Sequence, residues 1–235
     1  MKFYRYQPIN KYTLTNLVKS KNWVADPMDF NDPFEFRMTD ISYLDSKGEL
    51  SYLDESGMKA RCHYEQNINK IGVISYSSIE NNTLMFSHYA DQHKGFCLEF
   101  DVPKENLIGM KKIRYQDNFK TINYPLDRDL LKRELITICT TKSKVWEYEQ
   151  EYRQLFTDKH FHAEYPGQLT GIIFGCKTSK DDIELVLSVI KQLDGLEISK
   201  AFIQKNTFNL GLCTVPFLDD GTFKVPQFWD GLYEA

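Results

Sequence analysis

Several signatures of cofactor and metal chemistry are missing from this chain of 235 residues. It contains no G-x-G-x-x-G, no G-x-x-x-x-G-K-[ST], no G-x-S-x-G and no H-E-x-x-H. The first two absences remove the main support for Rossmann and P-loop nucleotide binding. The last two remove the main support for an α/β-hydrolase and for a zinc metalloprotease.

Cysteine is sparse and does not form a recognisable framework. An odd number of widely spaced cysteines with apolar neighbours argues against a set of disulfides. No C-x-x-C pair is present, so we do not expect a structural zinc knuckle. For the preferred interpretation given below, we expect no bound metal. The five cysteines are Cys62, Cys97, Cys139, Cys176 and Cys213.

The chain also lacks a basic block, a long apolar run and an apolar leader. The formal net charge is −4, and the densest basic clusters are Lys111 with Lys112 and residues 142–144. We therefore expect no duplex nucleic acid as a partner. No stretch approaches 18 apolar residues and residues 1–6 contain no signal-peptide core, so we expect no membrane partner and a cytoplasmic location.

Aromatic residues, by contrast, are abundant. They make up 14% of the chain, with 14 Tyr and 16 Phe, while the hydrophobic and charged fractions are ordinary for a globular protein. Aromatic side chains bury large areas and often line ligand sites. This composition predicts a packed protein with a pocket.

Hydrophobic periodicity predicts about eight short strands and four or five helices in irregular order. The absence of regular alternation, of repeats and of a linker favours one α+β domain over residues 1–235, with a mixed or split sheet. We expect strands at 3–6, 23–25, 71–77, 96–100, 112–115, 151–156, 169–174, 198–203 and 208–215. We expect helices at 11–20, 49–70, 82–90, 126–141 and 179–193, and a polar loop at 40–48.

Charged residues are concentrated in residues 146–153, W-E-Y-E-Q-E-Y-R. If residues 149–153 are extended, Glu149, Glu151 and Arg153 project from one face of the strand. One interpretation is a solvated edge strand in which Arg153 pairs with Glu151. The alternative is a polar site in an apolar wall, which the interleaved aromatic residues favour.

A second group of polar residues begins within the strand expected at 71–77 and continues to His88. Ser75 and Ser77 alternate in a segment otherwise rich in Ile and Val, which indicates either close approach of a ligand or the start of a turn. His88, with His93 and Cys97, does not match the ligand spacing of a common zinc site. We therefore expect His88 to be a hydrogen-bonded residue that anchors structure or ligand.

Arg5 is the third candidate. It lies between Tyr4 and Tyr6 on the first expected strand and points away from both. Such an arginine is typical of a surface or an interface, and it is also the preferred side chain for capturing phosphate.

The turn-rich segment 26–35 is the last candidate. Its prolines and Asn/Asp residues exclude a helix or a central strand. We expect Phe30 and Phe34 to anchor the turn in the core. We expect Asn31 and Asp32 to hydrogen-bond neighbouring backbone, and the turn to border the pocket.

These motifs together resemble the bacterial family called domain of unknown function 2971. That family shows a Y-x-Y start, an F-N-D-P-F-E turn, an S-x-S strand, a hydrophobic-S-H-Y-A helix leading to G-F-C-L-E-F, and W-x-x-E-x-E-Y-R. Here these are residues 4–6, 30–35, 75–77, 85–90, 95–100 and 146–153. The resemblance runs from the N-terminus to about residue 175.

A second resemblance bears on chemistry. The order of an arginine, S-x-S and E-x-E on successive strands is similar to the R-S-E arrangement of ADP-ribosyltransferases, which bind NAD in a split-sheet fold without a glycine loop. The resemblance implies that Arg5 holds the NAD phosphates or ribose and that Ser77 supports the nicotinamide-side ribose. It implies that Glu151 is the catalytic carboxylate and that Glu149 orients the acceptor. The middle motif, Ser-Tyr-Ser-Ser, departs from the usual Ser-Thr-Ser.

The remaining binding residues that we expect belong to the same motifs. They are Asn31, His88, Tyr89 and Arg153. With the four residues above, they would form a site for NAD as a substrate.

We therefore expect an NAD-dependent ADP-ribosyltransferase-like enzyme with an unspecified acceptor, in a setting of bacterial conflict or phage defence. The alternative is a non-catalytic sensor module that recognises a nucleotide or a protein. A third interpretation is a hydrolase or nuclease that uses Glu149, Glu151 and His88 around a metal.

Overall fold

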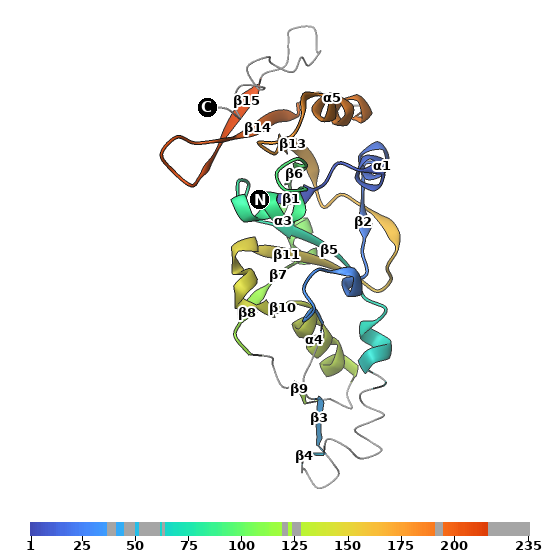
Figure 1. The fold of residues 1–235 in the computed structure, drawn as a ribbon. Helices are drawn as coiled ribbons and strands as arrows, with labels where there is room; N and C mark the ends of the chain where they lie inside the picture. The colour runs from blue at the N-terminus through green and yellow to red at the C-terminus, as the bar shows by residue number, and fades with distance from the viewer. Residues whose placement is uncertain are drawn as a thin grey trace.

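The computed structural model describes residues 1–36, 41–44, 50–51, 62, 64–118, 122–123, 128–190 and 195–215. This part of the chain forms a mixed α/β structure around one eight-stranded sheet, with smaller strand pairs beside it. Figure 1 shows the strands of the large sheet following one another along the long direction of the molecule.

The large sheet has the order β15-β14-β13-β6-β1-β5-β11-β7. Its neighbouring strands are antiparallel except β13 and β14, which run parallel. Its strands are β1 (Lys2–Gln7), β5 (Gly72–Ser77), β6 (Phe96–Asp101), β7 (Met110–Lys112), β11 (Glu151–Phe156), β13 (Gln168–Phe174), β14 (Glu197–Ile203) and β15 (Leu210–Val215).

Alternation along the central strands builds a core on each face of the sheet. On one face Phe3 packs with Leu98 and Phe100, and helices α1 (Lys11–Lys19) and α5 (Lys180–Val189) cover them. On the other face Tyr4 and Tyr6 pack with Cys97 beneath helix α3 (Thr83–Tyr89). The expected division of the strand at 96–100 into an aromatic face and a Cys97 face is confirmed.

Three of the expected helices begin directly after a capping residue. The Asn10 side chain accepts the backbone N–H groups of Tyr12 and Thr13 at the start of α1. Asn82 caps α3, and Ser179 caps α5. These side chains satisfy backbone donors that have no partner inside the helix.

The large sheet is split between β1 and β5. These two strands pair at a single position, Tyr4 opposite Ser77, whereas β1 and β6 pair along six positions. On the N-terminal side of Ser77, the strand β5 lies beside the end of β2 (Lys21–Val24), where Val73 bridges Ala25. The sheet therefore opens between the Gln7 end of β1 and β5, as the expectation of a split sheet required.

The remaining elements flank the large sheet. Two short strands, β8 (Arg114–Gln116) and β10 (Thr141–Ser143), pair in parallel, and β12 (Phe161–Glu164) pairs with β2. Strands β3 (Ile41–Leu44), β4 (Leu50–Ser51) and β9 (Ile122–Asn123) form a sheet at one end of the molecule (Figure 1). The other helices are α4 (Arg128–Cys139) and the 3-10 helices η1 (Pro27–Asp29), η2 (Lys104–Gly109) and η3 (Lys144–Glu149).

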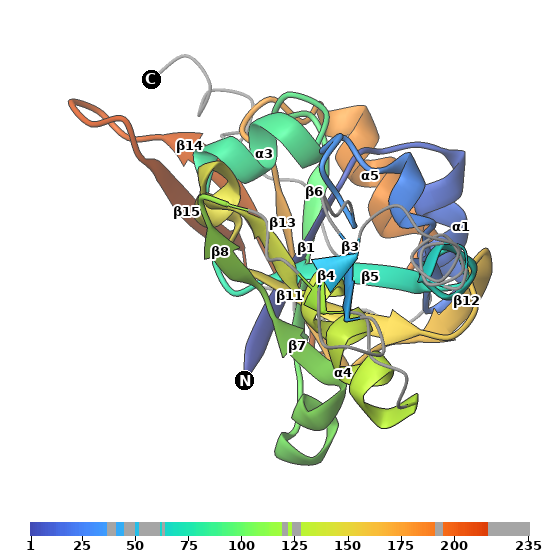
Figure 2. The same ribbon diagram turned by 90° about the horizontal axis from the view of Figure 1, so that it is seen from below.

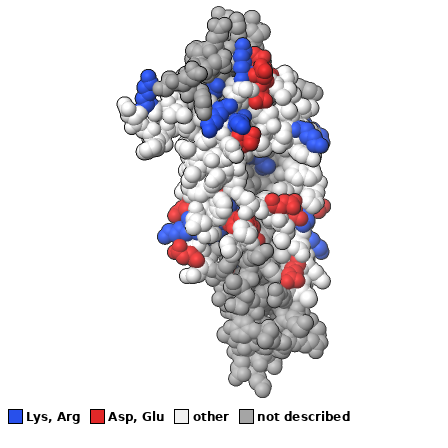
Figure 3. Space-filling view, in the orientation of Figure 1, with Lys and Arg blue, Asp and Glu red and all other residues white. Residues whose placement is uncertain are grey.

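Figure 2 shows the hairpin of β14 and β15 projecting from the body of the molecule, while α1 and α5 lie together on the opposite side. Among the described residues, no helix has the length and apolar character that a bilayer crossing requires. On the face visible in Figure 3, acidic and basic side chains are interspersed over the described part.

Several expectations were wrong in detail. Part of the loop expected at 40–48 is the strand β3, and the start of the helix expected at 49–70 is the strand β4. Residues 64–68 are helical as expected, while 45–49 and 52–61 lie outside the described residues. The expected start of the helix at 126–141 and the expected end of the helix at 179–193 also lie outside the described residues.

The strand expected at 112–115 is two strands. Ile113 still donates its backbone N–H to Glu151, but the N–H of Arg114 bonds to Thr140 instead. Between Ile113 and Arg114 the chain therefore changes its hydrogen-bonding partner from β11 to the segment that leads into β10. The pattern that predicted one strand at 112–115 spans the end of β7 and the start of β8.

Candidate functional site

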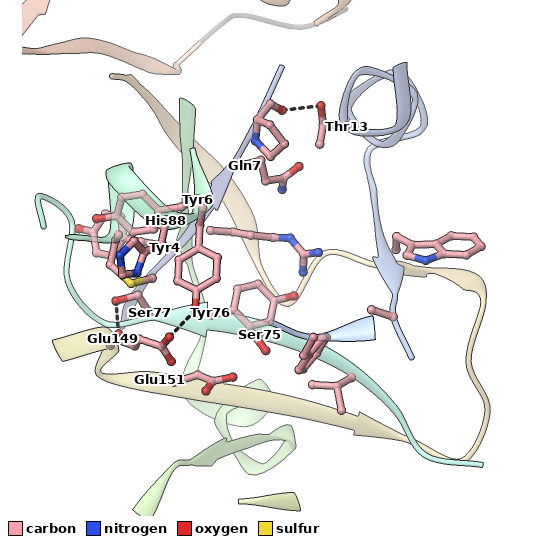
Figure 4. Close-up of a pocket in the computed structure, with 18 of the residues that line it drawn as sticks. Tyr4, Tyr6, Gln7, Thr13, Ser75, Tyr76, Ser77, His88, Glu149 and Glu151 are labelled. Carbon is pink, nitrogen blue, oxygen red and sulfur yellow. Dashed lines mark hydrogen bonds between the residues drawn. The ribbon is translucent and has the colours of Figure 1, made fainter. Parts of the chain in front are cut away.

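A pocket of about 920 Å³ lies where the sheet splits. Its walls come from β1, β5, α1, β2, α3 and residues 142–151. Figure 4 shows Glu149 and Glu151 toward one end, Thr13 of α1 at the other, and Gln7 between them. The volume lies at the upper end of the range typical of small-molecule sites.

The acidic end rests on five buried charged residues. Glu35, Glu149 and Glu151 contribute three carboxylates, while Lys142 and Arg153 contribute two cations. The ammonium Nζ of Lys142 lies 2.7 Å from Glu149 and 3.3 Å from both Glu151 and Glu35. The cluster carries a formal charge of −1 when all five groups are ionised, so one carboxylate charge is not matched inside it.

Arg153 uses every N–H of its guanidinium group. Nε and Nη2 donate to the two oxygens of Glu151 at 2.6 and 2.9 Å. Nη1 and Nη2 donate to Glu35 at 2.9 and 2.6 Å, and Nη1 also donates to the carbonyl of Cys139 at 2.9 Å. The Phe30 and Phe36 rings lie 5.9 and 5.6 Å from its central carbon.

The position of Arg153 differs from both sequence interpretations. It is fully buried and is not among the residues that line the pocket, so it has no donor left for a cofactor. It does pair with Glu151, but β11 lies between β5 and β7 and is neither an edge strand nor solvated. Its role here is to hold Glu35 and Glu151 in place.

The two pocket carboxylates differ in their acidity. Burial alone would raise the pKa of Glu151, but the charges of Arg153 and Lys142 outweigh it and lower the pKa to about 2. Burial raises the pKa of Glu149 above its ordinary value, and Lys142 offsets this only in part. Burial disfavours an ionised carboxylate and a nearby cation favours it, so the two environments act in opposite directions.

Glu149 does not lie in a strand, contrary to the expectation for 149–153. It ends η3, and Gln150 follows with a φ of +46°, in the left-handed region. This turn brings Glu149 to the same end of the pocket as Glu151, the first residue of β11. The Ser77 hydroxyl donates to the carbonyl of Glu149 at 2.6 Å and fixes the turn (Figure 4).

Ser77 is itself nearly enclosed. Its oxygen also accepts the backbone N–H of Ile79 at 3.1 Å, and the residue is 1% exposed. It lines the pocket wall, but its hydroxyl proton is already donated to Glu149. Ser75 lies two residues earlier on the same face of β5 and is more exposed to the pocket.

Three further predicted residues line the pocket: Tyr89, Asn31 and His88. The Tyr89 hydroxyl donates a hydrogen bond to the Glu149 carboxylate, and the Asn31 side chain lies close enough to Tyr89 to lower its pKa. Burial and the charge of Glu149 raise the pKa of Tyr89. His88 is exposed, and its Nδ1 lies 2.8 Å from the hydroxyl of Tyr148.

Arg5 lies on the opposite side of the split from β5. Its Nη1 and the side-chain nitrogen of Gln7 are buried and have no hydrogen-bond partner among the described residues. No carboxylate of the described part forms an ion pair with it, and its central carbon lies 5.9 Å from the Tyr76 ring. Burial lowers the pKa of Arg5, and Tyr76 and Tyr165 offset this effect only in part.

The turn at 30–35 borders the pocket through Phe30 and Asn31. The Asp32 side chain accepts the backbone N–H of Phe34 at 2.9 Å, as expected for a residue that organises a turn. Phe34 is 55% exposed and does not anchor the turn; Phe36 is buried instead. Phe30, the other expected anchor, does pack against the buried cluster that contains Phe36.

Seven of the eight predicted site residues line one pocket: Arg5, Asn31, Ser77, His88, Tyr89, Glu149 and Glu151. Sequence reasoning missed Glu35, Lys142 and Gln7. Lys142 belongs to the cluster at 142–144, which carries no signal of burial, and Glu35 was only the last residue of a turn. Within the described residues, no three His, Cys, Asp or Glu side chains are grouped to hold a metal.

Comparison with known proteins bears on the family and leaves the chemistry open. The chain matches no curated protein and no solved structure. Residues 85–154, which include most of α3, β6, Lys142, Glu149 and Glu151, match the family described as protein of unknown function DUF2971, and this match supports the resemblance to that family.

Proposed function

We propose that the pocket binds NAD or a nucleotide of the same type and that the chain is an ADP-ribosyltransferase-like enzyme. The observation that carries this proposal is that Arg5, Ser77, Glu149 and Glu151 line a single pocket at the split of the sheet. A setting in bacterial conflict or phage defence and the identity of the acceptor stay predictions.

Glu151 is suited to the electrostatic part of the reaction. Cleavage of the bond between nicotinamide and ribose creates positive charge on the ribose, and a fixed carboxylate stabilises it. With a pKa of about 2, Glu151 keeps its negative charge at neutral pH. Arg153 holds both of its oxygens, so its orientation is set before the substrate binds.

Glu149 is suited to the proton-transfer part. Its raised pKa makes it a better base than an ordinary glutamate once it is ionised. Two carboxylates whose environments move their pKa values apart are typical of sites that need one charged group and one proton acceptor. We assign Glu149 to the acceptor, whose nucleophilic group must lose a proton as it attacks the ribose carbon.

Arg5 and Gln7 are suited to the phosphates. A buried guanidinium without a carboxylate is costly, and an anionic ligand would compensate for that cost. Arginine binds phosphate through two parallel hydrogen bonds, and the unpartnered side-chain nitrogen of Gln7 adds a further donor.

One observation favours the alternative of a binding module without catalysis. Both pocket carboxylates are already paired with cations, Glu151 with Arg153 and Lys142, and Glu149 with Lys142. Carboxylates that are already paired with cations suit recognition of ligand hydroxyls as well as they suit charge stabilisation. Turnover therefore decides between the two functions.

The test follows nicotinamide release from NAD by the purified chain, with and without cell lysate as a source of acceptors. The transferase predicts release that Glu151→Gln suppresses. The binding module predicts no release by either protein. Absence of release together with no thermal shift from millimolar NAD would contradict the transferase.

A further inference from the structure

The end of the pocket formed by α1 and β2 has no part in the roles assigned above. The polar and aromatic residues that line it come from α1, β2 and β12, and they are Tyr12, Thr13, Thr15, Asn16, Trp23 and His162. Its Thr13 lies far from Glu149 in Figure 4, with Gln7 between the two. A ligand that reaches this end as well as Glu149 must therefore pass Arg5 and Gln7.

Trp23 gives this end an aromatic wall. Its strand neighbours Asn22 and Val24 are buried, whereas Trp23 points out of the core and is 36% exposed. His162 lies opposite it in the β2–β12 register, with ring centroids 5.1 Å apart, and His160 stacks on it at 6.2 Å. A tryptophan held between two neighbouring rings offers a preformed surface at little entropic cost.

The polar groups at this end are neutral. His162 Nε2 lies 3.1 Å from the side-chain oxygen of Asn16, which joins β12 to α1. Burial and the charges of Lys19 and Lys21 lower the pKa of His162, so its imidazole is uncharged at neutral pH. The residues lining this end include no Lys or Arg, so it is less suited to a phosphate than the Arg5 region.

We infer that Trp23, His162 and Asn16 form a subsite for the planar heterocyclic base of a nucleoside. The base packs against Trp23, while Asn16 and the neighbouring threonines are the hydrogen-bonding groups within its reach. The pyrophosphate of the ligand then lies at Arg5 and Gln7. The sugar on the far side of the pyrophosphate from the base lies toward Glu149 and Glu151. The ligand class is therefore a nucleoside joined through a pyrophosphate to a second sugar. This inference rests on the proposed function.

The size of the pocket agrees with such a ligand. At about 920 Å³ it approaches the upper limit of the usual range for small-molecule sites. A mononucleotide bound at Arg5 alone would leave one end empty, either the end at Trp23 or the end at Glu149.

The test uses calorimetric titration with ADP-ribose and with pyrophosphate, which lacks the base. Trp23→Ala should weaken ADP-ribose binding about tenfold, the size typical of losing one aromatic stacking partner, and should leave pyrophosphate binding unchanged. His160→Ala is the matched control, because His160 touches the same ring but does not line the pocket. Trp23→Leu keeps more of the side-chain volume and gives the same comparison if Trp23→Ala does not fold.

Equal ADP-ribose affinity in Trp23→Leu and His160→Ala would overturn the subsite. So would wild-type protein that binds ADP-ribose no better than pyrophosphate. Nicotinamide release is measured on the same proteins. Selective loss of ADP-ribose affinity in the Trp23 variants, without nicotinamide release by the wild type, would support the subsite and contradict the transferase. Nicotinamide release by the wild type, with unchanged ADP-ribose affinity in the Trp23 variants, would support the transferase and contradict the subsite.

Discussion

Glu149 and Glu151 share one ammonium group, that of Lys142, at 2.7 and 3.3 Å. Arg153 contacts only the second of them. The residue that separates their pKa values is therefore Arg153, which does not itself line the pocket. The first predictions follow from this asymmetry.

Replacing Glu151 by Gln should lower the rate of nicotinamide release about 10²–10³-fold, because one preorganised charge is lost at the developing cation. NAD affinity should change much less, since that charge appears mainly in the transition state. The measurement is steady-state release of nicotinamide with a separate NAD titration. Glu35→Gln is the control, because it removes a charge from the same buried cluster without touching the pocket. A similar loss in both variants would mean that Glu151 acts only through folding.

Replacing Glu149 by Gln should reduce transfer to an acceptor more than it reduces hydrolysis of NAD. Only the acceptor needs a base placed for it in our assignment. In the wild type, transfer should fall as the pH drops through the raised pKa of Glu149, because the protonated carboxyl cannot accept a proton. The two products, labelled acceptor and free ADP-ribose, are quantified from one reaction. Equal loss of both at every pH would contradict the assignment.

Glu151 should also make stability depend on pH in the acid range. Its pKa is about 2 in the folded chain against 4.5 ordinarily, so its contribution is complete above 4.5 and is lost as the pH falls toward 2. At about 1.4 kcal/mol per pKa unit, the free energy of unfolding should drop by about 3 kcal/mol across this window. Urea unfolding at successive pH values would measure the slope. In Glu151→Gln the free energy of unfolding should lose this part of its pH dependence. The same slope in the variant as in the wild type would contradict a stabilising ion pair between Glu151 and Arg153.

The turn at 30–35 should separate stability from binding. Asp32→Ala removes the acceptor for the Phe34 N–H, so we expect it to lower the free energy of unfolding by about 1 kcal/mol or more. Asn31 lines the pocket beside Tyr89, so we expect Asn31→Ala to weaken ligand binding by a similar amount. Urea melts and ligand titrations on both variants test this. Wild-type values in both measurements for both variants would refute it.

The chain should fold without disulfides or zinc. All five cysteines are free thiols, and Cys97, Cys139 and Cys176 are buried, where a thiol acts as a small hydrophobic group. Thermal melts with and without a reductant and a chelator should coincide. A clear loss of melting temperature with the chelator would revive the metal-dependent interpretation.

The sequence pattern was most informative where one local rule decided the structure. Short apolar or alternating segments located β1, β5, β6, β11 and β13, and helical periodicity located α1, α3 and α5. The same reasoning placed seven of the eight candidate residues on what proved to be one pocket. Those residues come from motifs in which polar side chains interrupt an apolar strand or helix.

Other features depended on contacts that are distant in the sequence. Lys142 is buried because three glutamates surround it, and one of them, Glu35, is more than a hundred residues away. Arg153 looked available to a ligand because the turn that supplies Glu35 could not be aligned with β11 from the pattern alone. Short strands such as β10 and β12 escaped notice because three or four residues carry too little periodicity.

The single pairing of Tyr4 with Ser77 divides the large sheet into a five-stranded part and a three-stranded part. Each part has continuous backbone pairing of its own, so local opening should separate them at this seam before it disrupts either part. A ligand that contacts β1 and β5 together would bridge the seam. Amide hydrogens near Ser77 should then exchange more slowly in the complex, and binding would join two independently opening units into one cooperative unit.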